Sequence, residues 1–457
     1  MLNVPNIEAG IGIEVYVSKT RGIGGVIKRS VEDFIVEEIL LNGLRASIHL
    51  EENRVRLADH GRYLICVLVK RGWDTLLAIE NIAKMLDIST DRIGFAGIKD
   101  ANAITAQYIS IGGIPIEKIF RINLENIWIK PLGYANEEIS PKNLFGNKFT
   151  IMVNSINLKE TTVLKRVKKI MEEITDFGGL PNFFGHQRFG TIRSITHVVG
   201  KHIIKGDFKS AALAFLAQES PFESPGIKRL RREIRETMNF RKTLRKFPEK
   251  FVYERLMLEH LSKKPNDFIG ALNRLPLNLR KLFVQAYQSF LFNKFLSERI
   301  RRGVSLKEAQ IGDYVLKLDE HGLPLKKAVK VEANNLSSIN QEVRRGKMAL
   351  ALPLVGLKQP LSEGLQGEIE REVLEIEDIR PEDFRNPLKI KVNAFGNLRV
   401  AVTKIMDFNF EILKDRRERS KNSVKFRFTL HRGAYATILL REFIKPPTDR
   451  YLIKSGF

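Results

Sequence analysis

Cysteine is almost absent from this sequence, whose 457 residues include only Cys66. A single cysteine excludes an internal disulfide bond and a zinc site built from several thiolates. Cys66 lies within an aliphatic run, residues 62–69. We therefore expect a thiol buried in the core rather than a catalytic nucleophile.

The common signatures of nucleotide and metal sites are also missing. The sequence contains no Gly-x-Gly-x-x-Gly, no P-loop and no His-Glu-x-x-His. Its eight histidines are scattered, and His197 and His202 are five residues apart, the wrong spacing for one face of a helix. We expect no metal site and no nucleotide cofactor.

Long apolar runs are missing as well. No stretch approaches the ~20 apolar residues that cross a membrane, and the first residues lack the basic and then apolar pattern of a signal peptide. We expect a soluble, cytoplasmic protein that does not contact a membrane. Hydrophobic residues make up 43% of the chain, enough for a sizeable core, and its length suffices for two or three domains.

Acidic residues are fewer than basic ones. The chain has 53 Asp and Glu and 76 Lys and Arg, which gives a net charge of +23. Adaptation to heat adds charges of both signs, so this surplus favours a polyanionic partner, most simply nucleic acid. The densest basic run, residues 228–250, has ten Lys and Arg against three Glu. A solvated helix face of this kind would repel itself. We therefore predict that it contacts the RNA backbone, through Arg231, Arg232, Arg235 and Arg245.

Hydrophobic periodicity predicts a mixed α/β chain. A strand pair or a bent strand is predicted at residues 25–39. Further strands are predicted at residues 62–69, 104–111, 127–129, 148–153, 312–316, 348–355, 388–392, 398–403 and 424–430. Helices are predicted at residues 74–86, 162–177, 192–218, 251–261, 279–301 and 438–443. Asp74 is expected to cap the first of these helices, and residues 143–147 are expected to form a turn.

Two stretches show neither the periodicity of a helix nor that of a strand. Residues 94–107 place Lys99 and Asp100 in a turn near glycines, with Thr105 and Gln107 on one face of the strand that follows. Taken alone, Asp100 is best interpreted as a helix cap or a turn residue. Residues 178–190 form a glycine-rich loop that also carries three phenylalanines. These aromatics suit stacking on exposed bases, and equally a loop folded into its own core.

The residues around Asp100 resemble the catalytic motif of the tRNA pseudouridine synthase D (TruD) family, Gly-Phe-Ala-Gly-Ile-Lys-Asp-x-x-Ala-x-Thr-x-Gln. Five further stretches resemble motifs of this family in the same order. They are residues 28–38 (Lys-x-x-x-Glu-Asp-Phe-x-Val-x-Glu), 146–149 (Gly-Asn-Lys-Phe), 182–190 (Asn-Phe-Phe-Gly-His-Gln-Arg-Phe-Gly), 288–293 (Gln-Ser-Phe-Leu-Phe-Asn) and 433–442 (Gly-Ala-Tyr-Ala-Thr, then Arg-Glu). Each is weak alone, but the ordered set is specific. The long basic segment between residues 200 and 285 resembles archaeal members.

The resemblance implies an isomerase that converts a uridine of tRNA, typically uridine-13 in this family, into pseudouridine. The N1–C1′ bond breaks, the uracil turns, and C5 bonds to C1′. Because the reaction is redox-neutral, it needs neither a nucleotide nor a metal cofactor. An aspartate is ordinarily ionised at pH 7, so it can attack C1′ or take the C2′ proton.

By the same resemblance Asp100 is the catalytic carboxylate. Phe184 takes the position of the phenylalanine that lies against the target base. Asn182 is expected to hydrogen-bond near Asp100 and to help orient it. The remaining candidates come from the matching motifs and are Lys28, Glu32, Lys99, Gln107, Gln187 and Arg188. The site is expected where the Asp100 turn meets the aromatic loop.

The fold that the resemblance implies is a pseudouridine synthase-type α/β (α+β) catalytic domain with a mixed sheet, interrupted by a large inserted α/β domain. This assigns residues 1–192 and 397–457 to the catalytic domain and residues 193–396 to the insert. The RNA would lie in the cleft between the two domains. A monomer is expected.

Two other functions stay open from the sequence. A non-catalytic RNA-binding or ribosome-assembly protein would use the same basic run and aromatic loop. A metal-dependent nuclease would use Asp100 as a ligand, but no second carboxylate lies at ligand spacing near it.

Overall fold

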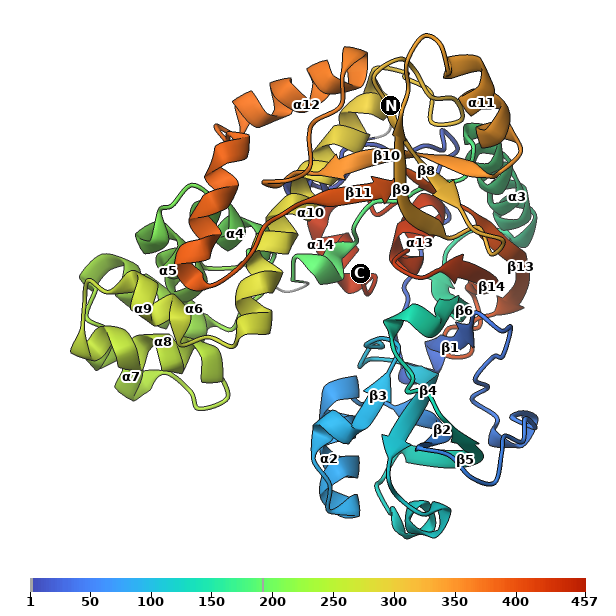
Figure 1. Cartoon of the computed structure of the whole chain (residues 1–457), viewed down its shortest axis with the longest axis horizontal. Coiled ribbons are helices and arrows are strands. Elements are labelled where there is room, and N and C mark those ends of the chain that lie inside the picture. The colour runs from blue at the N-terminus through green and yellow to red at the C-terminus, as the bar shows by residue number, and fades with distance from the viewer. Residues whose placement is uncertain (1–2, 191–192) are drawn as a thin grey trace.

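A computed structural model describes residues 3–190 and 193–457. The chain forms one long sheet, a smaller sheet and a group of helices (Figure 1). The predicted mixed α/β class is therefore confirmed. Within the described residues, no helix combines the length and the apolar character that crossing a membrane requires.

The larger sheet has eight strands and runs from the middle of Figure 1 to its lower end. Its order is β13-β14-β6-β1-β4-β2-β5, and β3 pairs with β4. The strands are β1 (Phe34–Leu40), β2 (Tyr63–Arg71), β3 (Ile93–Phe95), β4 (Ile104–Gly112), β5 (Ile127–Ala135), β6 (Leu144–Ile156), β13 (Ile405–Lys414) and β14 (Asn422–His431). The β1–β4 pair is parallel, and the sheet joins strands from both ends of the chain.

The lower part of this sheet is buried on both faces, which explains why β2 and β4 have near-continuous apolar runs. Helix α2 (Thr75–Leu86) covers one face, where Ile82 packs in a cluster with Leu68. The Asp74 side chain accepts hydrogen bonds from two backbone N–H groups of the first turn, so the predicted cap is confirmed. Cys66 is fully buried, and burial raises the pKa of its thiol, as expected of a core residue.

The middle part of the sheet carries the helices α3 (Glu160–Phe177) and α13 (Ala436–Ile444). Strand β14 alternates as predicted, with Val424, Phe426, Phe428 and Leu430 all buried. The Phe426 ring lies 4.8 Å from that of Phe443 on α13. The interlocked aromatic rings fix α13 against the sheet.

The remaining elements form the smaller sheet and the helical lobe. The four-stranded sheet has the order β11-β10-β8-β9, and a separate pair joins β7 to β12. These strands are β7 (Leu180–Pro181), β8 (Tyr314–Leu318), β9 (Pro324–Lys330), β10 (Met348–Leu354), β11 (Asn397–Val400) and β12 (Val402–Thr403). The other helices are α1 (Asn6–Gly10), α4 (Thr196–Ile204), α5 (Phe208–Ala217), α6 (Pro225–Thr237), α7 (Phe240–Lys246), α8 (Val252–Lys263), α9 (Phe268–Asn273), α10 (Leu277–Arg301), α11 (Leu336–Arg344), α12 (Gly364–Ile376) and α14 (Asp449–Lys454).

Helices α4–α9 gather at the left of Figure 1, and α10 runs from this lobe into the middle of the molecule. The β7–β12 pair holds the chain before residue 193 beside the chain after residue 396, as an inserted domain requires. Strand β11, which begins at residue 397, pairs with β10 inside the proposed insert. The division at residues 192 and 396 stays a prediction.

Several local predictions are wrong. Residues 144–147, expected in a turn, begin β6, and a side chain at Gly146 would collide with the Leu430 carbonyl of β14. Residues 388–390 belong to a 3₁₀ helix (Pro381–Ile390) rather than a strand. The helix predicted at 192–218 divides into α4 and α5, and residue 192 lies outside the described residues. Strand β9 is mostly exposed, so it lacks the apolar pattern that would have predicted it.

Candidate active site

Asp100 lies in the loop between β3 and β4 and receives hydrogen bonds from three segments. Its Oδ2 lies 2.6 Å from Lys28 Nζ and 2.6 Å from Gln187 Nε2. Its Oδ1 accepts from the Asn102 backbone N–H at 2.9 Å. The side chain is 14% exposed, so the carboxylate is enclosed but reachable. The Asp100 turn and the aromatic loop therefore meet, as the sequence predicted.

Lys28 reaches Asp100 from the segment that precedes β1. Its backbone is left-handed, with φ of 55°, which is uncommon for a residue with a side chain. The ammonium lies 4.6 Å from the centre of the Phe34 ring, an arrangement that favours the cation. The local backbone and this ring thus aim the ammonium at the carboxylate.

Lys70 is a site residue that the sequence reasoning missed. It ends the buried part of β2, is fully buried, and donates to the carbonyl oxygens of Asp100 (3.0 Å) and Trp73 (2.6 Å). It therefore fixes the backbone of the Asp100 turn. A lysine directly after an otherwise apolar central strand was the signal that could have revealed it.

The titration of Lys70 gives a pH-dependent prediction. Burial lowers its pKa from 10.5 to about 8, against the attraction of Asp74 and Asp100. Between these two values the unfolded chain binds more protons than the folded chain, so stability rises with pH. We expect the stability advantage of the wild type over Lys70→Met to increase by on the order of 1–2 kcal/mol from pH 7.5 to 9.5.

Urea unfolding of both proteins at the two pH values measures this change. Burial also lowers the pKa of Lys445 to about 8, but this lysine is present in both proteins and its contribution cancels. A wild-type advantage that stays constant with pH would contradict the assigned titration.

Lys99 and Gln107 lie behind the turn rather than on the Asp100 carboxylate. The Lys99 ammonium pairs with the buried Glu38 at 2.6 Å. Gln107 Nε2 donates to the Gly97 carbonyl at 3.3 Å. Both are buried and hold the turn from within the sheet.

Glu32 is not brought to the site. It forms an ion pair with Arg71, and the two side chains are 47% and 46% exposed. This pair lies at the surface, where its effect on stability is small.

Phe184 is held in the aromatic loop by α10. Its backbone N–H donates to Asn293 Oδ1 at 2.8 Å, and its carbonyl accepts from Asn293 Nδ2 at 3.0 Å. The side chain is 8% exposed, and the Arg399 guanidinium lies 4.0 Å from the ring centre. Of the two interpretations of this loop, burial in the core is the one that the structure shows. Contact of Phe184 with the target base stays a prediction.

The role expected of Asn182 requires a correction. Its side chain donates to the Val400 carbonyl and accepts from Arg399, at 3.0 and 2.7 Å. These bonds connect the aromatic loop to β11. They engage the Asn182 amide, which therefore does not bond to Asp100. The amide that orients the carboxylate is that of Gln187.

Arg188 belongs to the aromatic loop, and both its guanidinium and that of Arg399 lie over the Phe184 ring. Arg188 bonds to Gln285 and Ser289 on α10, at 3.1 and 3.3 Å. Burial lowers the pKa of Arg399 to about 10, so it stays charged at neutral pH. Arg399 was missed because it lies in a short predicted strand that carries no motif of its own.

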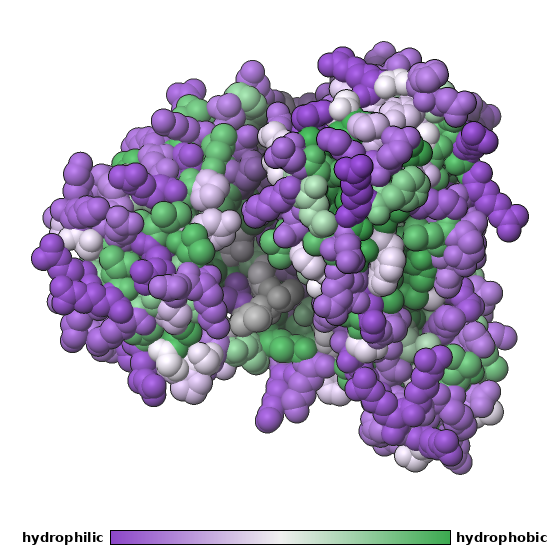
Figure 2. All heavy atoms as spheres, turned by 90° about the horizontal axis from the view of Figure 1, so that it is seen from below, coloured by the Kyte–Doolittle hydropathy of each residue, from purple (hydrophilic) through white to green (hydrophobic). Residues whose placement is uncertain are grey.

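The basic run divides into buried and exposed arginines. Arg231 is 1% exposed and pairs with Glu223 and Glu254 at 2.9 and 3.1 Å, so its assignment to the RNA backbone is wrong. Arg232 and Arg235 are 52% and 57% exposed and share one partner, Glu219. Arg245 is exposed on α7, and no ion pair to it occurs within residues 3–190 and 193–457. Viewed from below, hydrophilic residues cover much of the surface on both sides of a central hollow (Figure 2).

Side chains able to hold a metal do not gather in the described parts of the chain: no three His, Cys, Asp or Glu come together there. Asp100 has an ammonium and an amide as neighbours instead. This environment suits a carboxylate that acts on an organic substrate.

Known proteins are similar to this chain in sequence and in fold. The family described as tRNA pseudouridine synthase D (TruD) matches residues 10–443. A "Probable tRNA pseudouridine synthase D" of Methanococcoides burtonii is 39% identical over 446 residues, 97% of this chain and 98% of that one. A protein of the same name from Thermococcus sibiricus is 37% identical, covering 94% and 97%. The crystal structure of a "Putative tRNA pseudouridine synthase D (TruD)" from Methanosarcina mazei has a TM-score of 0.82 at 36% identity, covering 97% and 99%.

Proposed function

Because the chain belongs to the tRNA pseudouridine synthase D (TruD) family, we propose that it converts uridine-13 of tRNA into pseudouridine with Asp100 as the catalytic carboxylate. It is an enzyme of the isomerase class, a tRNA pseudouridine synthase. The target position and the role of Asp100 are the parts that we propose.

The observation that carries the proposal is the convergence on Asp100. Lys28, Gln187 and the turn itself come from three distant segments, and each lies in one of the family's motifs. Together they hold one ionisable carboxylate, partly exposed, at a fixed orientation. A helix cap or a turn residue would not need two distant side chains to position it.

The reaction requires a carboxylate and a place for the detached uracil. Asp100 acts either at C1′ as a nucleophile or at C2′ as a base, and both routes release the N1–C1′ bond. The uracil then turns and C5 bonds to C1′; this displaces the Asp100 carboxylate from C1′ in the first route, and the proton returns from Asp100 to C2′ in the second. The C5 proton is then lost. Lys28 and Gln187 bond to the same carboxylate oxygen, which leaves Oδ1 as the oxygen with fewer partners. We assign Oδ1 as the reacting atom.

Loss of the C5 hydrogen provides the test. Wild-type protein should release tritium from unmodified tRNA labelled at C5 of uridine, without added metal or nucleotide. A tRNA with cytidine in place of uridine-13 should release none from that position. Absence of release from any tRNA would refute the activity, and unchanged release from the cytidine-13 tRNA would refute the position alone.

We further propose that a monomer carries out this reaction in the cytoplasm, with tRNA between the catalytic residues 1–192 and 397–457 and the insert at 193–396. Sedimentation of the protein at assay concentration would show whether it is a monomer.

The exposed arginines of the basic run give a prediction on binding. Alanine at Arg232, Arg235 and Arg245 together should weaken tRNA binding and flatten its dependence on salt, by about 0.7–0.9 in slope for each phosphate that is no longer neutralised. Arg231 is left unchanged because it is buried in an ion pair.

Titration of labelled tRNA at several salt concentrations measures this slope. A matched control replaces three exposed lysines of α3, namely Lys165, Lys168 and Lys169. Equal slopes for the two triple variants would show that only net charge matters and would contradict a specific contact.

A further inference from the structure

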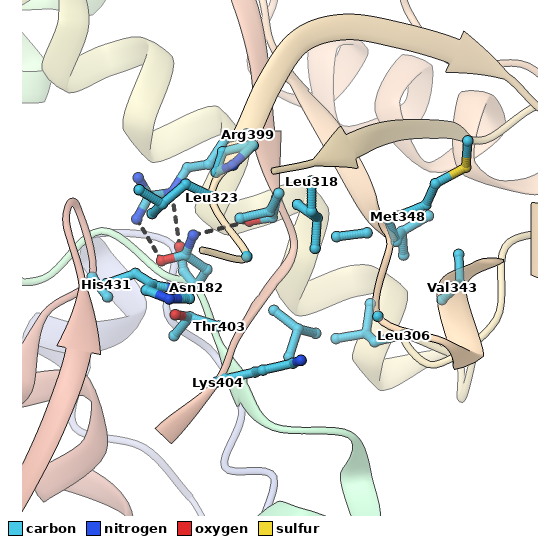
Figure 3. Close-up of a pocket in the computed structure, with 18 of the residues that line it drawn as sticks. Asn182, Leu306, Leu318, Leu323, Val343, Met348, Arg399, Thr403, Lys404 and His431 are labelled. Carbon is cyan, nitrogen blue, oxygen red and sulfur yellow. Dashed lines mark hydrogen bonds between the residues drawn. The ribbon is translucent and has the colours of Figure 1, made fainter. Parts of the chain in front are cut away.

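A cavity of about 530 Å³ lies between the four-stranded sheet and the β7–β12 pair. Figure 3 shows Asn182 and Arg399 joined by hydrogen bonds beside it. Arg399 also stacks on Phe184, so this wall of the cavity is shared with the aromatic loop of the active site. Asp100, Lys28 and Gln187 do not line it. The cavity therefore adjoins the catalytic site without being part of it.

The lining of the cavity combines an apolar surface with positive charge. Leu318, Leu323 and Leu398 contribute apolar side chains, while Lys307 and Lys404 contribute ammonium groups. No Asp or Glu is among the lining residues. In the part of the chain that the structure describes, neither lysine has an ion-pair partner. Unpaired cations around an apolar pocket fit an anionic ligand with a hydrophobic part.

A buried polar atom without a partner also lies in this lining. Nε2 of His431 is buried and has no hydrogen-bond partner among the described residues. Burial lowers the pKa of His431, so the ring is neutral at neutral pH and can donate or accept. Buried polar atoms are ordinarily paired, and a ligand in this cavity would supply a partner for Nε2.

We infer that this cavity binds a second unstacked nucleotide of the substrate RNA, one adjacent to the target uridine. The inference rests on the proposed function. Extruding a uridine for chemistry breaks its stacking with its neighbours, which leaves a neighbouring base to be held elsewhere. The leucines accept the face of the base, Arg399 and His431 its polar edge, and Lys307 and Lys404 its phosphates.

The size and position of the cavity favour a nucleotide over a free anion or a peptide. Its volume falls in the range of pockets that enclose small organic molecules, whereas an inorganic anion would leave the leucines uncovered. The Asn182–Arg399 wall places it one side chain away from Phe184. A base held against Phe184, as proposed, would therefore lie next to this cavity.

A double-mutant cycle between RNA and protein tests the inference. The RNA carries an abasic residue, in turn, at each of the two nucleotides on either side of the uridine that the tritium assay identifies. The protein change is Ala349→Trp, which fills the cavity from a half-buried position on β10. At one flanking position the abasic residue should weaken binding to wild-type protein about tenfold, and the same change should have no further effect on Ala349→Trp.

Lys404→Glu provides a second test, which stays valid even if the protein does not accommodate tryptophan at position 349. It should weaken tRNA binding about tenfold, whereas Lys118→Glu, the same charge change at an exposed residue distant from the cavity, should not. An abasic penalty that persists in Ala349→Trp, or no penalty at any flanking position, would overturn the inference. If these results came with normal tritium release, the proposed function would stand and the second nucleotide site alone would fall.

Discussion

Replacing Asp100 with asparagine should lower the single-turnover rate of pseudouridine formation by at least about 10⁴-fold. This corresponds to about 5.5 kcal/mol of lost transition-state stabilisation. Asparagine has the same shape but neither the charge to attack C1′ nor the basicity to take the C2′ proton. Both routes are therefore blocked in Asp100→Asn. The variant thus shows whether the Asp100 carboxylate takes part in catalysis or only shapes the turn.

Binding should change far less than chemistry. The amide oxygen of the introduced asparagine can still accept the Asn102 N–H, which closes the turn, while Lys70 still bonds to the backbone carbonyl. We expect tRNA affinity to stay equal or to increase slightly, because a negative charge leaves the RNA-binding surface. Filter binding gives the affinity, and tritium release under single-turnover conditions gives the rate.

Asp87→Asn is the matched control, at the end of the helix that covers the same sheet. Asp87 is exposed and follows α2 in a left-handed conformation that asparagine adopts readily. Its replacement removes one negative charge without touching the site, so the rate should match that of the wild type. Release by Asp100→Asn within tenfold of the control would refute the catalytic assignment.

Deuterium at C2′ of the target uridine distinguishes the two routes available to Asp100. Removal of the C2′ proton as a rate-limiting step would slow the reaction of the deuterated RNA severalfold. Attack at C1′ leaves the C2′ bond intact and predicts only a small effect. The comparison uses the wild-type protein and the same single-turnover assay.

The sequence predicted the parts of the molecule that local patterns determine. The apolar run of β2, the capped helix α2 and the alternation of β14 follow from periodicity and capping, which act within one element. The role of Asp100 could not be predicted from its local sequence, because the turn alone indicated a helix cap or a turn residue. Its candidate role came from motifs spread over the chain, and the structure now shows two of them, at Lys28 and Gln187, in contact with it.

Contacts between distant segments were what the sequence could not predict. Asn182 and Gln187 lie five residues apart in one loop, and only the tertiary path decides which amide reaches Asp100. Arg231 resembles its neighbours in sequence, but the helix turns it inward to Glu223 and Glu254. Lys70 bonds to a carbonyl thirty residues away. In each case the choice of partner depends on packing between elements.

Replacing Lys28 with methionine should lower the rate about 100-fold to 1,000-fold with little change in tRNA affinity. The ammonium makes a charge-assisted hydrogen bond to Oδ2 at 2.6 Å. Without it, Gln187 and the Asn102 N–H alone hold the carboxylate, and the anion loses the cation that offsets its burial. Methionine is unbranched and only one atom shorter than lysine, and it meets the same left-handed backbone, so the backbone cost is unchanged.

Two further variants show whether Lys28 acts through its bond to Asp100 or only through its positive charge. Lys28→Arg retains a cation and should recover part of the lost rate, whereas Arg71→Met removes a cation that pairs with Glu32 at the surface. Arg71→Met and Glu32→Gln should both react at rates close to that of the wild type, because neither residue contacts Asp100. If Lys28→Met also reacted at the wild-type rate, the ion pair would have no part in catalysis, and Gln187 would be sufficient to orient the carboxylate.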